Sequence, residues 1–392
     1  MILPRLVDNF WDRGPIAVRT VHVVFEAPLK NGSGAQLRNL AVSASLSFMG
    51  PTSLIVVQYL LPDLMKNPER RPSFVEARFP AHVVDAVAKQ VRHYDPDYCI
   101  VEGVYLSQIS DRLLLEGQKV AVDLHNIESA LQQDIDRVRY GWRAGLLYRR
   151  RWALASEAER RLAAKAHRVW VCSSHDAASL LALGEVQTPI DVVPNPVPPW
   201  CHDHDHNHAH RSRPVSEIHA LFVGHLGYAP NTVAVKRLVK RIFPGIRTAH
   251  PAAKLEICGR TPPKWLKKLL SGQPSITLVA NPESLAPSYE RASVALIPLT
   301  EGGGTRLKIL EAMALGVPVI ATKKAVEGLD VVPGQTFLEA ETDADFVEAC
   351  TRLTEQPALW KRLADQGRAF AVANHSQAVL NQAVHASLAA DT

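Results

Sequence analysis

Cysteines are few in this sequence of 392 residues, and no two of them are spaced as a CxxC pair. They are Cys99, Cys172, Cys201, Cys258 and Cys350. An odd and scattered set argues against a disulfide framework, so we expect reduced thiols and a cytoplasmic protein.

Long apolar runs are also absent. No run reaches the ~18 residues that a membrane-spanning helix needs. Residues 1–12 mix apolar residues with Pro4, Asp8 and Asp12, which is not the pattern of a signal peptide. We therefore expect no spanning helix, and membrane contact, if it exists, would be peripheral at the inner face.

Aromatic residues make up only 6% of the chain, and no concentrated basic tail is present. The net charge of +5 is mildly basic, which suits nucleotide phosphates or an anionic membrane but does not indicate nucleic-acid binding. A hydrophobic content of 47% with 21% charged residues is typical of soluble globular proteins. The length suggests about two to three domains.

Apolar segments alternate with helical patterns along the chain, which predicts an α/β protein with doubly wound parallel sheets. Strands are predicted at 20–25, 52–58, 98–101, 119–123, 168–172, 219–223, 254–258, 276–279, 294–299 and 318–321. Helices are predicted at 35–48, 81–93, 144–166, 232–242, 306–315 and 344–354. This order favours two Rossmann-like domains, at 1–198 and 216–375.

A polar segment separates these domains. Residues 199–215 contain the alternating histidines of His202–His210, and we predict a linker or loop there because little of this segment can be buried. Imidazole binds Zn²⁺ and Ni²⁺ well. A functional metal site also needs fixed geometry and supporting partners. We therefore favour adventitious metal binding and predict no metal site.

The most informative motif follows the apolar run 294–299. Three glycines let backbone N–H groups approach a ligand, and a helix N-terminus adds unpaired donors. Two basic side chains suit phosphate, and a carboxylate deeper in the helix can accept sugar hydroxyls. The motif begins at Gly302, and the residues that we predict to bind the ligand are Gly303, Gly304, Thr305, Arg306, Lys308 and Glu311. This combination suits a nucleotide or a nucleotide sugar.

Four further stretches place small or polar residues at predicted strand ends, where parallel sheets bind ligands. Gly34 lies in a glycine-rich turn after the first strand, and His125 follows strand 119–123. In the second half, Gly224 follows strand 219–223 and Gly259 follows strand 254–258.

Together these motifs resemble the donor site of retaining glycosyltransferases with the GT-B fold, of the large family 4 type. The chain is similar to a subgroup whose donor motif consists of three glycines, then Thr-Arg, a Lys, and Leu-Glu-Ala-Met. The resemblance implies two Rossmann-like domains facing across a cleft, with a C-terminal helix, 376–392, crossing back to the first. It also implies sugar transfer from a UDP- or GDP-sugar to an acceptor hydroxyl, with retention of configuration and no required cofactor. The acceptor would be a sugar, a lipid-linked or another small molecule, in polysaccharide, glycolipid or other glycoconjugate biosynthesis.

The same resemblance assigns roles to single residues. It places His125 and Gly34 beside the transferred sugar and the diphosphate, and Glu311 at the ribose. The chain departs from the family where His225 and Pro230 replace an Arg and a Lys that bind diphosphate. It departs again where Gly303 replaces the first of two carboxylates eight positions apart. Arg306 and Lys308 are the available substitutes for the missing cations.

These departures keep two alternatives open. One is a noncatalytic nucleotide-sugar-binding or scaffold protein, and the other is a sugar-nucleotide epimerase of the same fold. A separate stretch is also open to two interpretations, because residues 137–152 interleave six arginines with aromatic and leucine residues. This pattern suits either binding to an anionic membrane or a lipid-phosphate acceptor, or a long amphipathic helix with a solvated arginine face.

Overall fold

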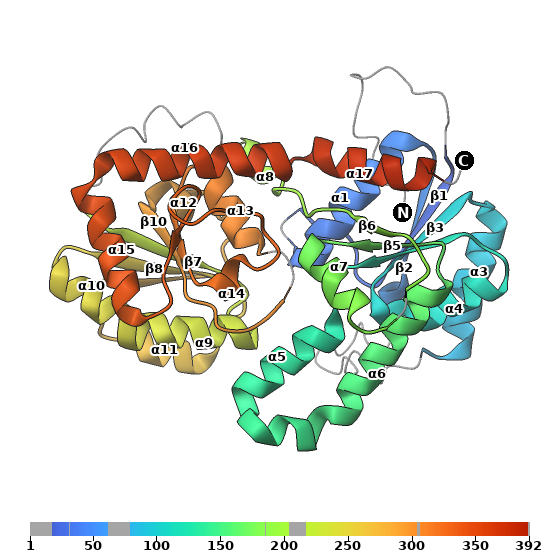
Figure 1. Cartoon of the computed structure of the whole chain (residues 1–392), viewed down its shortest axis with the longest axis horizontal. Coiled ribbons are helices and arrows are strands. Elements are labelled where there is room, and N and C mark those ends of the chain that lie inside the picture. Colours follow the sequence, from blue (N-terminus) through green and yellow to red (C-terminus); the bar gives the residue numbers. More distant parts are fainter. Residues whose placement is uncertain are drawn as a thin grey trace.

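The computed structural model describes residues 18–30, 32–61, 79–184, 186–203, 217–303 and 306–390. They form two α/β domains that lie side by side, as shown in Figure 1. Each domain is built on a six-stranded sheet in which every pairing is parallel. This confirms the predicted fold class of two doubly wound parallel-sheet domains.

The first sheet has the strand order β2-β1-β3-β4-β5-β6. Its strands are β1 (Thr20–Val24), β2 (Thr52–Val56), β3 (Tyr98–Glu102), β4 (Val120–Leu124), β5 (Arg168–Val171) and β6 (Ile190–Val192). Its helices are α1 (Gly34–Met49), α3 (Ala81–Tyr94), α4 (Ser107–Leu115), α5 (Glu128–Tyr140), α6 (Ala144–Lys165) and α7 (Ser174–Leu181). The central strands are buried along their whole length, because helices cover both faces of a parallel sheet.

The second sheet has the order β12-β11-β10-β7-β8-β9. Its strands are β7 (His219–Val223), β8 (Lys254–Gly259), β9 (Ile276–Ala280), β10 (Val294–Ile297), β11 (Val319–Ala321) and β12 (Leu338–Glu339). Counted from β7, this is the order 3-2-1-4-5-6 in reverse, which is that of dinucleotide-binding Rossmann sheets.

Helices also enclose the second sheet. They are α8 (Trp200–Asp203), α9 (Ala229–Arg237), α10 (Phe243–Ala249), α11 (Lys264–Leu270), α12 (Ala286–Arg291), α13 (Leu307–Ala314), α14 (Lys323–Val326), α15 (Asp343–Glu355) and α16 (Pro357–Asn374). A π-helical turn, Leu238–Ile242, continues α9 towards α10.

The chain then returns to the first domain through α17 (Gln377–Ala389), which lies along α1 in Figure 1. Leu380, Val384 and Leu388 are fully buried in a core cluster with residues of α1 and the first sheet. Trp170 Nε1 donates a 2.7 Å hydrogen bond to Ser387 Oγ. The first domain therefore takes part of its core from a helix that follows the second domain in the chain.

Helix α5 also links the domains. Lys324 Nζ of α14 lies 2.5 Å from Asp134 Oδ2 of α5. A Cβ built on Gly303 would lie 3.4 Å from Leu131 Cδ1, so α5 packs against the glycine-rich loop of the second domain. The base of α5 is thus held at the boundary between the domains.

The segment predicted as a linker, 199–215, differs at its start. Cys201 is buried in the core cluster of the second domain, and the Trp200 ring lies 5.9 Å from that of Tyr289. Burial of these apolar side chains attaches the first residues of the predicted linker to the second domain. Residues 204–216 and the side chains of His202 and Asp203 lie outside the described part, so most of the histidine run is not placed.

Two further findings concern the described ranges alone. None of their helices is long and apolar enough to cross a membrane. No group of three or more His, Cys, Asp or Glu side chains in them is arranged to hold a metal ion.

Candidate functional site

The strand orders determine where ligands would bind. In open parallel sheets, ligands bind at the carboxyl edge, where the strand order reverses. That point lies between β1 and β3 in the first sheet and between β7 and β10 in the second. The chain segments that leave these four strands therefore supply the candidate site.

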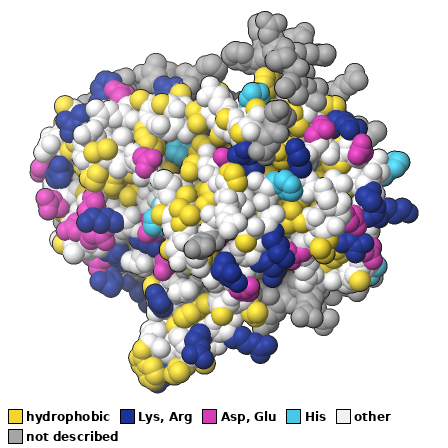
Figure 2. Space-filling view, turned by 45° about the vertical axis from the view of Figure 1, so that its right-hand side comes forward, with side chains coloured by type: hydrophobic (Ala, Val, Ile, Leu, Met, Phe, Trp, Pro, Cys, Tyr) yellow, Lys and Arg dark blue, Asp and Glu magenta, His cyan; other side chains and the backbone are white. Residues whose placement is uncertain are grey.

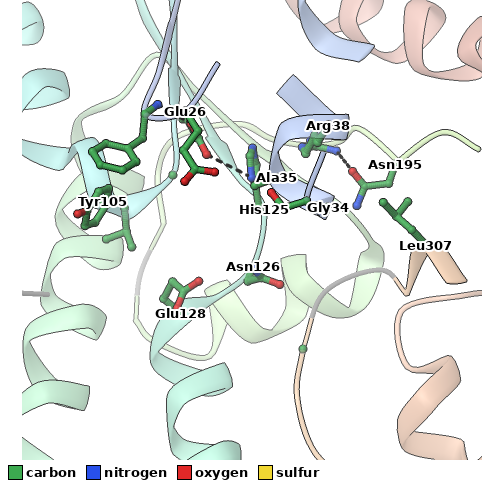
Figure 3. Close-up of a pocket in the computed structure, with 16 residues that line it drawn as sticks. Glu26, Gly34, Ala35, Arg38, Tyr105, His125, Asn126, Glu128, Asn195 and Leu307 are labelled. Carbon is green, nitrogen blue, oxygen red and sulfur yellow. Dashed lines mark hydrogen bonds and ion pairs between the residues drawn. The ribbon is translucent and has the colours of Figure 1, made fainter. Parts of the chain in front are cut away.

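A pocket of about 350 Å³ lies at this edge and is lined by both domains (Figure 3). The first domain contributes Phe25, Glu26, Ser33, Gly34, Ala35, Arg38, Glu102, Gly103, Val104, Tyr105, His125, Asn126, Glu128 and Asn195. The second contributes Gly303 and Leu307. The structure thus brings three predicted site residues, His125, Gly34 and Gly303, into one cavity.

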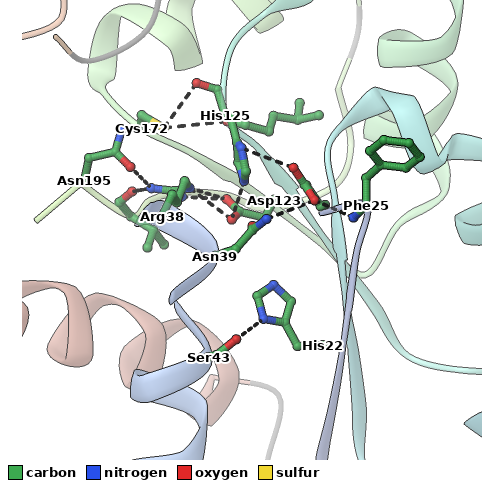
Figure 4. Close-up of polar contacts among 12 residues, drawn as sticks. His22, Phe25, Arg38, Asn39, Ser43, Asp123, His125, Cys172 and Asn195 are labelled. Atoms are coloured by element: carbon green, nitrogen blue, oxygen red, sulfur yellow. Dashed lines mark hydrogen bonds and ion pairs between the residues drawn. The ribbon is translucent and has the colours of Figure 1, made fainter. Parts of the chain in front are cut away.

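A buried ion pair supports the floor of the pocket (Figure 4). Arg38 Nη2 of α1 lies 2.5 Å from Asp123 Oδ1 of β4, and neither side chain is more than 1% exposed. Arg38 Nη1 also donates to Val193 O and Asn195 Oδ1, both at 2.9 Å. Although burial opposes it, the Arg38 charge holds the pKa of the Asp123 carboxyl well below its ordinary value. Both groups therefore stay charged.

His125 lies between two carboxylates. Because β4 ends at Leu124, His125 is the first residue beyond the carboxyl edge of the sheet. Its Nε2 lies 3.3 Å from Asp123 Oδ2, and its Nδ1 lies 3.7 Å from Glu102 Oε1. Burial raises the pKa of Glu102, whose Oε2 accepts hydrogen bonds from Phe25 N and Asn39 Nδ2. The imidazole thus stands between two carboxylates and lines the pocket, where it can contact a ligand hydroxyl.

The pocket has two chemically different ends. At one end, α1 begins at Gly34, with Ser33 as N-cap and a capping box to Gln36. A helix start presents amide donors and a partial positive charge, which favours an anion. On the side away from Gly34 lies Glu26, and the carboxylates of Glu102 and Glu128 also line the pocket; all three can accept hydrogen bonds from hydroxyls. Figure 3 shows Gly34 and Leu307 on one side, Glu26 and Tyr105 on the other, and His125 between them.

The other predicted nucleotide-binding residues that the structure describes lie close together in the second domain. A Cβ on Gly259 would lie 1.8 Å from the carbonyl oxygen of Gly224, so only glycine lets these two strand ends approach. A Cβ on Gly224 would lie 2.9 Å from Lys308 Nζ. The Lys308 ammonium therefore stands beside the turn in which the family resemblance places a diphosphate.

Lys308 is held in place before any ligand binds. Its Nζ donates a 2.6 Å hydrogen bond to Asn231 Oδ1 and lies 4.5 Å from the centre of the Phe222 ring. Burial, reinforced by the charge of Arg306, lowers the pKa of Lys308 to about 7. An arriving anion would favour the protonated form.

Arg306 is folded over its own loop. Its Nη1 donates a 2.5 Å hydrogen bond to Gly303 O, and its Nε has no hydrogen-bond partner among the described residues. Gly302 has a φ of +100°, which favours glycine and lets the loop curl around the guanidinium. Glu301, two residues before Gly303, is buried and is not among the residues that line the pocket.

Glu311 has a protein partner that the sequence did not indicate. Tyr289 OH donates a 2.8 Å hydrogen bond to Glu311 Oε2, and burial raises the pKa of this carboxyl to about 7. Among the described residues no hydrogen bond to its other oxygen, Oε1, is found. Gly304 and Thr305 lie outside the described residues.

Sequence reasoning missed several residues of the pocket. Glu102 carried a usable signal, because it is a carboxylate at the end of a predicted strand. Glu26 follows β1 in the same way. No sequence signal pointed to Arg38, since its partner Asp123 is 85 positions away in the chain.

Comparison with known proteins agrees with this geometry. Residues 217–356 match the model of the family described as glycosyl transferases group 1. The matched residues lie in the second domain. They contain the Gly224 turn, Gly259 and helix α13 with Lys308 and Glu311.

A curated relative is described as an uncharacterized 44.6 kDa protein in the cps region of Klebsiella pneumoniae. It is 25% identical over 164 residues, which are 40% of this chain and 42% of the relative. The matched part thus spans about two fifths of the relative's length.

Solved structures share the fold over most of the chain. Sucrose-phosphate synthase from Thermosynechococcus elongatus has a TM-score of 0.70 at 17% identity, over 95% of this chain and 100% of that one. HepE of Anabaena, solved in complex with UDP, has a TM-score of 0.66 at 11% identity, again over 95% and 100%. The two domains thus have the GT-B arrangement, as predicted.

Proposed function

We propose that this protein transfers a sugar from a nucleotide-diphosphate sugar to an acceptor hydroxyl, with retention of anomeric configuration. The observation that carries the proposal is the pocket between the domains. It joins His125 and the start of α1 to the glycine-rich loop of a group 1 glycosyltransferase domain. The UDP in the HepE structure supports a nucleotide-sugar donor, UDP- or GDP-linked.

In this proposal the diphosphate lies between the Gly224 turn and the N-terminus of α1. Lys308, Arg306 and the amide groups of α1 stabilise the charge that develops as the sugar leaves. The sugar occupies the pocket, where its hydroxyls meet His125 and the carboxylates. No step requires a carboxylate nucleophile, because the leaving phosphate can take the acceptor proton on the same face.

Glu311 is proposed to accept a hydrogen bond from the ribose through the oxygen that Tyr289 leaves available. The pathway is proposed to be the assembly of a polysaccharide, a glycolipid or another glycoconjugate. The acceptor hydroxyl would enter past Glu26 and Tyr105, at the end of the pocket opposite Gly34.

Incubation with a panel of UDP- and GDP-sugars tests this function. Release of free nucleoside diphosphate, by slow hydrolysis or on addition of an acceptor, is the expected result. The anomeric configuration of the product, measured by NMR, tests retention. An epimerised nucleotide sugar would instead support the epimerase alternative. Binding without any turnover would support the noncatalytic one.

The first prediction concerns Arg306. Replacing Arg306 by Ala should weaken binding of the matching nucleoside diphosphate tenfold or more, because a charge-assisted contact contributes about 1.5–3 kcal/mol. Isothermal titration calorimetry measures this. Lys267→Ala removes one charge from the exposed face of α11 in the same domain and should change little. Unchanged affinity in a folded Arg306→Ala protein would refute the assignment.

The second prediction concerns pH and Lys308. The pKa of Lys308 is about 7 in the free protein, and a bound diphosphate should raise it. Binding is then strongest below pH 7 and weakens as the pH rises above that value, by up to about tenfold per pH unit until the bound pKa is reached. Calorimetry between pH 7 and 9 should show this slope together with proton uptake.

Lys308→Arg is the matched control, because arginine stays protonated throughout this range. It should flatten the pH dependence of the dissociation constant while still binding the nucleotide. The same slope in the wild type and in Lys308→Arg would show that another group titrates.

A further inference from the structure

Helices α5 and α6 project from the first domain as a helical hairpin, seen below it in Figure 1. Their connection, Gly141–Arg143, lies at the far end of this projection. We call residues 137–154 the hairpin tip. The opposite end of α5 packs at the domain boundary, so the tip is an extension of the region that contains the pocket.

Part of the arginine-aromatic stretch serves only to hold the hairpin together. Trp152 is buried, and its Nε1 donates a 2.8 Å hydrogen bond to Asp136 Oδ2. Arg151 pairs with the same carboxylate at 2.5 Å and lies 4.7 Å from the Tyr148 ring centre. These residues join α5 to α6 and need no partner to explain them.

Three other apolar residues of the tip are largely exposed. Trp142 is 78% exposed, Leu146 77% and Leu147 61%. Exposed large apolar side chains that gather at one end of a projection are typical of an interaction site. In Figure 2 this end is the yellow protrusion at the lower edge of the molecule, bordered by dark blue basic side chains.

The charge around these side chains has one sign. Val138–Ser156 contains no Asp or Glu. The exposed arginines of the tip are Arg137, Arg139, Arg143, Arg149 and Arg150. A tip with a Trp and two Leu at its end and arginines around them matches an anionic lipid surface, where the apolar groups enter the interface and the arginines meet phosphates.

We propose that the hairpin tip docks this protein on an anionic membrane surface. A second copy of the chain fits less well, since two such tips would bring like charges together. Docking would place the pocket near the lipid headgroups, because α5 runs from the tip to the pocket residue Glu128. The inference stands apart from the sugar transfer, since docking needs neither donor nor acceptor.

Sedimentation with vesicles tests this proposal. The full chain should bind vesicles of phosphatidylcholine with about one third phosphatidylglycerol at least tenfold more tightly than pure phosphatidylcholine vesicles. The triple variant Trp142→Ser, Leu146→Ser and Leu147→Ser should lose at least tenfold in binding. Charge reversal by Arg143→Glu, Arg149→Glu and Arg150→Glu should do the same.

Matched controls alter other exposed sites. Leu115→Ser with Leu181→Ser removes exposed leucines elsewhere on the first domain, and Lys264→Glu, Lys267→Glu and Lys268→Glu reverses as many charges on α11. Both should bind the anionic vesicles like the wild type. Equal loss in tip and control variants would overturn the proposal, as would failure of the wild type to bind. Self-association in analytical ultracentrifugation that the tip variants abolish would also overturn it and assign the tip to a second copy.

Discussion

Replacing His125 by Ala should lower turnover about a hundredfold or more, the usual effect of removing a positioned polar group from a transition state. The imidazole stands between Asp123 and Glu102 and lines the pocket, whereas Lys308 and Glu311, which are assigned to the nucleotide, are not among its lining residues. Affinity for the nucleoside diphosphate should therefore stay within about twofold. Release of nucleoside diphosphate from the donor measures turnover, and calorimetry measures affinity.

His93→Ala is the control, because His93 is an exposed histidine of α3 in the same domain. It should leave both quantities unchanged. A purely structural His125 would instead lower stability and affect turnover and nucleotide binding together. Wild-type turnover in a folded His125→Ala protein would remove His125 from the mechanism.

Asp123→Asn should cost about 3–5 kcal/mol in the stability of the first domain, because it leaves the buried guanidinium of Arg38 without a counter-charge. Both side chains are almost completely enclosed, so water cannot compensate. Hydrogen exchange of β4 and β5 under increasing urea measures the loss, with the strands of the second domain as an internal reference. If the hydrogen exchange of β4 and β5 changed little, the Arg38 and Asp123 pair would not be a main source of stability in this domain.

The double variant Arg38→Met with Asp123→Asn tests the cause. It removes both charges, so it should be less destabilised than Asp123→Asn alone. A pH series gives a second check, because the folded pKa of Asp123 is depressed. Its contribution is fully present above the ordinary pKa of about 4 and is lost as the pH falls further.

The fold was largely predictable from the sequence because both faces of its sheets are covered. Central strands such as Val120–Leu124 are then nearly continuous apolar runs, and the turns between them carry glycine or polar residues. Two edge strands do not have this pattern and were not predicted. Ile190–Val192 is partly exposed, and Leu338–Glu339 has only two residues.

The site was predictable where a side chain directly follows a strand, as His125 does. It was not predictable where the partner comes from another part of the chain. The Arg38 and Asp123 pair and the Tyr289 contact with Glu311 depend on packing that no local pattern encodes. The sequence likewise indicated an arginine-aromatic stretch but could not separate the buried Trp152 from the exposed Trp142.

The return of α17 to the first domain has a consequence for biosynthesis. The ribosome delivers α1 and β5 before the second domain, and α17 only after it. At ~5–20 residues per second, the roughly 200 residues between Trp170 and Leu380 take about 10–40 s to synthesise. During that interval the nascent first domain lacks the cover of Leu380, Val384 and Leu388, and this part of its apolar surface is open to chaperones or to aggregation. A fragment meant to represent the first domain alone must therefore carry residues 377–389 as an appended helix.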